Sequence, residues 1–186
     1  TMTEENNTFM IGHYDTPAYF ILLDGTIIAD RIDMQGGIST ASLGINSNST
    51  LVADSGAIVR DRSTLYGEGT VDGDLILSGT ITCDYSHVGY PNVTGNLSMN
   101  DHPVTDIDDS GTIRYYFDPY DGDANNDYDS IEVGGDVNLG GLLYLYGGGQ
   151  VAENAGDQAI VIDAEGSING EFDSVWAHYF SEDLVP

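Results

Sequence analysis

The sequence predicts an all-β protein: a right-handed parallel β-helix of stacked short rungs with a capped C-terminal end, in a single domain over 1–186. Two observations predict this fold. Short apolar runs are separated by corners of Gly, Asn, Asp and Ser, without long connections. A pattern of glycines and alternating aliphatic residues also returns at 66–82, 128–146 and 159–175, as stacked rungs require. No window has the apolar spacing of an amphipathic helix, so we expect almost no helix.

The N-terminal third begins with a polar, acidic stretch, 1–8, which we expect to fray. The apolar run 18–23 ends at an Asp-Gly turn and is predicted to be a strand. Further short strands are predicted at 26–28, 31–34, 43–45, 51–52 and 57–59. Turns at 36–37, 46–48 and 54–56 separate them.

The remainder of the chain repeats the same strand-and-corner pattern. Strands are expected within 71–82, on both sides of a corner in 93–99, at 111–117, within 130–162 and within 167–175. The open ends of such a stack are edges that need covering. We expect the aromatic residues 176–180, at the start of the tail 176–186, to cover one end.

The charge of the chain excludes several kinds of partner. There are 31 acidic residues against four basic ones, all arginine, for a net charge of −27. Nucleic acids need clustered Lys or Arg, and anionic membrane surfaces need them too, so we expect neither as a partner. No apolar run approaches the roughly 20 residues that cross a bilayer, so no membrane insertion is expected. We interpret the many acidic residues in one of two ways: they keep the chain soluble, or they bind divalent cations.

One acidic stretch, 121–132, has the spacing of a calcium loop. Its oxygen-bearing residues stand at positions 1, 3, 5, 7, 9 and 12 of the EF-hand pattern. They are Asp121, Asp123, Asn125, Asp127, Asp129 and Glu132. Asn126 stands where that pattern has glycine, and strands are predicted where an EF-hand has helices. The stretch is therefore either a Ca²⁺ site or a solvated acidic turn, and no other cofactor is expected.

Outside 121–132, few residues in the sequence have a pattern that indicates catalysis or binding. The four histidines lack zinc-ligand spacing, and Cys83 stands alone, which suits a buried apolar role. Arg60 and Arg62 are expected to share a strand face and pair with Asp61. The aromatic residues of 115–120, with Tyr144 and Tyr146, either stack on sugars or alternate between core and solvent. No catalytic residue is assigned.

Three segments carry a family resemblance. The stretches LYGEGTVDGDLILSGTIT, YDSIEVGGDVNLGGLLYLY and QAIVIDAEGSINGEFDSV follow one another in order. Together, over 65–175, they resemble the C-terminal part of autotransporter passenger domains, as in pertactin-like surface proteins. The resemblance implies a right-handed parallel β-helix at a Gram-negative cell surface, or shed from it, whose last rungs form a stable folding nucleus.

The function expected from this resemblance is non-enzymatic. We expect a cell-surface or secreted adhesin module that contacts a host or sister-cell surface protein or glycan, or associates with itself. One alternative is a structural stalk of a larger surface protein. Another, by analogy of fold alone, is a polysaccharide lyase or hydrolase.

Overall fold

The computed structural model describes residues 7–12, 15–35, 39–83, 89–99, 111–117, 130–147 and 160–178. Within these residues the chain forms parallel strands and no helix, as the sequence predicts. A helix long and apolar enough to cross a bilayer is accordingly absent from the described part of the chain.

Three parallel sheets make up the fold, and each strand pairs with the strand three places later in the chain. The first sheet contains β1 (Thr8–Ile11), β4 (Arg31–Met34), β7 (Ala57–Val59), β10 (Leu75–Leu77), β13 (Leu97–Ser98), β16 (Val137–Leu139) and β19 (Ile168–Gly170). The second contains β2 (Ala18–Leu22), β5 (Ala41–Ile45), β8 (Ser63–Tyr66), β11 (Thr80–Thr82), β14 (Thr112–Phe117), β17 (Leu142–Gly147) and β20 (Ser174–His178). The third contains β3 (Gly25–Ala29), β6 (Ser49–Ala53), β9 (Thr70–Asp72), β12 (Asn92–Val93), β15 (Ile131–Val133) and β18 (Ile162–Ala164).

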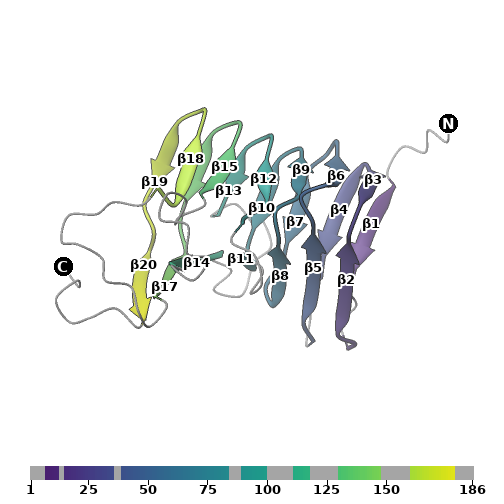
Figure 1. Ribbon diagram of the computed structural model, residues 1–186, viewed down its shortest axis with the longest axis horizontal. Helices are drawn as coiled ribbons and strands as arrows, with labels where there is room; N and C mark the ends of the chain where they lie inside the picture. Colours follow the sequence, from purple (N-terminus) through teal and green to yellow (C-terminus); the bar gives the residue numbers. More distant parts are fainter. Residues whose placement is uncertain are drawn as a thin grey trace.

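The chain is therefore a parallel β-helix, in which three successive strands complete one rung. Figure 1 shows the rungs following one another along the long axis, from β1–β3 near the N-terminus to β19 and β20 near the C-terminus. This confirms the predicted fold class. The right-handed winding stays an expectation, based on the strong preference of parallel crossovers for that hand.

Alternation along each strand builds the core. Every second side chain points inward, and the parallel register places inward residues of successive rungs in columns. One column of the second sheet consists of Leu43, Leu65, Ile81, Ile113 and Leu143, all buried. The apolar columns of the three sheets meet inside the rod and form one continuous hydrophobic core. Cys83 is buried as part of this core, as predicted.

A ladder of polar side chains holds the corners between the third and first sheets. Asp74 Oδ1 accepts a hydrogen bond from the backbone N–H of Asn96 at 2.8 Å. Asn96 Oδ1 then accepts from the N–H of Asp136, and Asp136 Oδ1 from that of Ser167, both at 2.8 Å. We call these four residues the corner ladder. The side chains of Asp74, Asn96 and Asp136 each satisfy a turn N–H one rung further on, so successive corners are linked.

The ladder also explains the glycine before each of its later members. A Cβ at Gly95 would collide with Asp74 Oδ1, and one at Gly135 with Asn96 Oδ1. The side chain from the preceding rung occupies the space in which a Cβ would lie. In the repeated Gly-Asx corners, the glycine therefore leaves space for the side chain of the preceding rung, and the Asx side chain bonds to the next rung.

The expectations for Arg60 and Arg62 need adjustment. Arg60 and Arg62 do not share a strand face: they lie in the turn between β7 and β8, and Arg62 has a positive φ of 60°. Arg62 lies 3.7 Å from Asp61, as expected, whereas Arg60 pairs with Asp33 of the preceding rung, because the stacking places that carboxylate nearer.

At the ends of the chain, Thr8 already belongs to β1 and residues 176–178 belong to β20. Trp176 therefore lies within a strand of the second sheet rather than over the end of the rod. The other residues of the predicted cap, 179–186, and of the predicted frayed start, 1–6, lie outside the described residues.

Candidate functional site

A row of polar side chains crosses the outer face of the third sheet. The positions next to the inward residues Leu51, Val71 and Val93 point outward, because successive residues of a strand alternate between faces. Lateral pairing aligns these outward positions across β6, β9, β12, β15 and β18 as Thr50, Thr70, Asn92, Glu132 and Asp163. The row becomes acidic toward the C-terminal rungs.

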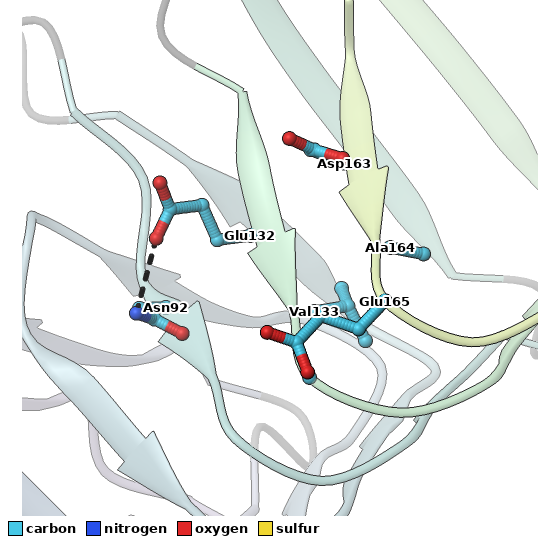
Figure 2. Close-up of a pocket in the computed structure, with 7 residues that line it drawn as sticks. Asn92, Glu132, Val133, Asp163, Ala164 and Glu165 are labelled. Atoms are coloured by element: carbon cyan, nitrogen blue, oxygen red, sulfur yellow. Dashed lines mark hydrogen bonds between the residues drawn. The ribbon is translucent and has the colours of Figure 1, made fainter.

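The acidic end of this row lies in a surface pocket of about 310 Å³. Figure 2 shows Glu132 of β15 turned toward Asn92 of β12, whose Nδ2 donates a hydrogen bond to Glu132 Oε2 at 3.2 Å. Asp163 of β18 and Glu165, the first residue after β18, lie on the other side of the pocket. The lining residues are Asn92, Glu132, Val133, Gly134, Asp163, Ala164 and Glu165.

Carboxylates dominate the electrostatics of this pocket. Glu132 and Asp163 are direct lateral partners in β15 and β18, and neighbouring strands lie about 4.8 Å apart. Glu165 contributes a third carboxylate, and no arginine is among the lining residues. These like charges repel one another, so the pocket favours ligands that are cations or hydrogen-bond donors.

The chemical capacity of the pocket is that of a polar contact surface. Carboxylate and amide oxygens suit hard cations, but in the described part of the chain no three His, Cys, Asp or Glu side chains are arranged to hold a metal ion. Glycoside hydrolysis needs one carboxylic acid kept protonated, commonly by burial. Glu132 and Asp163 are both exposed to solvent.

Most of the predicted calcium loop cannot be placed against this geometry. Asp121, Asp123, Asn125, Asp127 and Asp129 lie outside the described residues. Glu132 is the member that the structure describes, and it lies in the pocket. Asp163 is not among the site residues predicted from the sequence, although aligning the repeats 128–146 and 159–175 places it opposite Glu132.

A second polar feature, on the first sheet, has a structural role. Asp33 is only 5% exposed, and its Oδ1 and Oδ2 accept hydrogen bonds from Arg60 Nε and Nη2 at 2.6 and 2.7 Å. Burial by itself raises the pKa of the Asp33 carboxyl. The hydrogen bonds and charge of Arg60, helped by Gln35 and Arg31, outweigh burial and hold that pKa below its ordinary value.

Comparisons of the chain with protein-family models, curated proteins and solved structures gave no match. The resemblance to autotransporter passenger domains therefore stays a prediction from the three sequence segments.

Proposed function

We propose that this chain is a non-enzymatic contact module of a bacterial cell surface, an adhesin-like rod that binds a host or sister-cell protein or glycan, or a second copy of itself. The observation that carries this proposal is the presence of large apolar side chains on the outside of the rod. Tyr19 and Ile28 of the first rung are 74% and 72% exposed, and Trp176 of the last is 61% exposed. A partner surface that covers such side chains removes their apolar area from water, which favours binding.

The rod geometry supports the same role. A parallel β-helix displays the outer side chains of its rungs at a constant spacing, so weak contacts repeat along one face. Repeated weak contacts add up through multivalency when several engage the same partner surface. The high negative charge keeps separate rods apart in solution unless specific contacts overcome the repulsion.

Bead aggregation with the purified chain tests this function. Beads coated with the chain are mixed with one another, and separately with bacterial or host cells, against beads coated with an inert acidic protein. An adhesin clumps the coated beads or retains cells on them. If neither occurs, the adhesin proposal fails and the rod is better explained as a stalk.

A polysaccharide hydrolase is the second candidate, because Glu132 and Asp163 place two carboxylates side by side in a surface pocket. Release of reducing ends from a broad panel of acidic and neutral polysaccharides tests it. Loss of the released product in the double variant Glu132→Gln, Asp163→Asn would assign the activity to this pocket. The absence of product from every polysaccharide would remove this candidate.

A further inference from the structure

The outer face of the second sheet carries a cluster of aromatic rings near its C-terminal end. Tyr144 and Tyr146 project from β17, and Trp176 and His178 are their lateral partners in β20. The ring centroid of Tyr144 lies 6.3 Å from that of Tyr146 and 6.5 Å from that of Trp176. The ring centroids of Tyr146 and His178 lie 5.5 Å apart. We call these four residues the aromatic platform.

The platform faces outward by construction of the fold. The residues between its members in the chain, Leu143 and Leu145, belong to or pack against the hydrophobic core. Strand alternation then directs Tyr144 and Tyr146 to the opposite face, where both are half-buried and Trp176 is exposed. The cluster is therefore separate from the core, and Trp176 and His178 are its exposed members.

Arg114 stands beside the platform and differs from the other arginines. It lies on β14 as the direct lateral partner of Tyr144, with its side chain exposed. Arg31 and Arg60 pair with Asp33, and Arg62 pairs with Asp61. Within the described part of this strongly acidic chain, Arg114 forms no ion pair. An exposed guanidinium that is left unpaired beside aromatic rings is a ready partner for a carboxylate.

The geometry points to a saccharide-binding site for a sugar that carries a single carboxylate, such as a uronic or sialic acid at the end of a glycan. The apolar C–H face of a pyranose ring packs on Tyr144 and Trp176, while Arg114 receives the carboxylate in a charge-assisted pair. Arg114 and Trp176 are two strand spacings apart, about 10 Å, a length that one or two sugar rings cover. This inference rests on the proposed contact role, for which it names the ligand class.

The charge of the chain restricts the ligand further. A net charge of −27 disfavours a glycan with many carboxylates or sulfates, because Arg114 neutralises one of these groups and the acidic chain repels the others. A neutral glycan leaves Arg114 without a partner. One carboxylate on an otherwise neutral saccharide satisfies both conditions.

Trp176 is the chain's single tryptophan, so its fluorescence reports on this site alone. The full chain is titrated with trisaccharides ending in glucuronic, galacturonic or sialic acid, and with matched neutral trisaccharides. We expect at least one acidic saccharide to give a saturable change, with about tenfold weaker binding of its neutral match. Equal binding of the two, or no response to any acidic saccharide, would overturn the inference.

Substitutions test the roles of Arg114 and of the aromatic platform separately. Arg114→Gln should abolish the preference for the acidic saccharide, and Tyr144→Ala should weaken binding of both members of a pair. Arg62→Gln, at an exposed arginine 3.7 Å from Asp61, is the matched control and should bind like the parent chain. Melting temperatures confirm that each variant folds. If Arg114→Gln keeps the preference, the assignment of Arg114 is wrong.

Bead aggregation on the same variants distinguishes this site from the broader function. Saccharide binding without any bead or cell adhesion would remove the adhesin proposal and leave the site in place. Adhesion by the parent chain without saccharide binding would remove the site and leave adhesion, through another surface.

Discussion

Asp74 and Asn96 are joined twice: Asp74 Oδ1 accepts hydrogen bonds from both the backbone N–H and the side-chain Nδ2 of Asn96, at 2.8 and 3.0 Å. The two residues are 22 positions apart and occupy the same corner of successive rungs. The relationship continues from Asn96 to Asp136 and on to Ser167. Part of the acidity of this chain therefore serves to fasten one rung to the next.

The corner ladder predicts a difference between two substitutions of Asp136. Asp136→Ala leaves the Ser167 N–H to water and should lower the free energy of unfolding by about 1 kcal/mol. Asp136→Asn keeps the accepting Oδ1, as Asn96 does at the equivalent position, and should cost far less. Urea denaturation of the two variants checks this. Equal losses would mean that the charge of Asp136, and not its hydrogen bond, is what matters.

Gly135→Ala should be destabilising on the order of 1–2 kcal/mol, because the new Cβ displaces Asn96 Oδ1 from the Asp136 N–H. The cost should shrink by at least about 0.5 kcal/mol when Asn96 is first changed to Ala, because the colliding atom is then gone. A double-mutant cycle by urea denaturation measures this coupling. Additive losses would show that the contact with the Gly95 backbone limits the site instead.

The pair of Asp33 and Arg60 predicts a specific dependence of stability on pH. Because the pKa of Asp33 is held below its ordinary value of 3.8, the pair stabilises the fold fully above that value. The contribution fades as the pH falls below 3.8 and through the lowered pKa. Asp33→Asn should therefore lower the melting temperature at neutral pH, and its difference from the parent chain should vanish in acid.

The control for this pair is Asp61→Asn, which removes an exposed carboxylate 3.7 Å from Arg62. Exposed pairs of this kind contribute little, so its melting temperature should stay near that of the parent chain at every pH. A difference between Asp33→Asn and the parent that persists unchanged in acid would mean that packing, not charge, stabilises Asp33.

Glu132→Gln should stabilise the chain by a few tenths of a kcal/mol, because it removes the repulsion from Asp163 while keeping an oxygen for Asn92. Glu171→Gln, at another exposed position, corrects for the general effect of removing one negative charge. Melting temperatures at low salt show the effect best, because salt screens exposed charges. A lower melting temperature for Glu132→Gln alone would mean that the charge-assisted hydrogen bond from Asn92 outweighs the repulsion from Asp163.

If the spacing of residues 121–132 forms a calcium site, calcium should raise the melting temperature relative to a chelator, since a ligand that binds only the folded state stabilises it. The double variant Asp121→Asn, Asp123→Asn should then lose this shift, and magnesium serves as the ion control. Equal melting temperatures in calcium and chelator would rule out a tight native-state site and favour the solvated acidic turn.

The sequence by itself determined the class of fold. Alternation in runs such as 137–145, with glycine at the corners between them, is a local property that strand geometry imposes on each rung separately. The burial of Cys83 and the strands at 57–59, 93–99 and 111–117 followed from the same local rules. These features need no knowledge of which rung lies beside which.

Only the tertiary structure decided which side chains meet across rungs. The pairing of Asp33 with Arg60 and of Asp74 with Asn96 depends on how successive rungs are aligned, and the paired residues lie 27 and 22 positions apart in the chain. The rungs vary in length, so sequence distance alone does not give that register. It is set by the stacking of buried columns such as the one that contains Leu65 and Ile81, because a slip of one residue would turn each column out of the core.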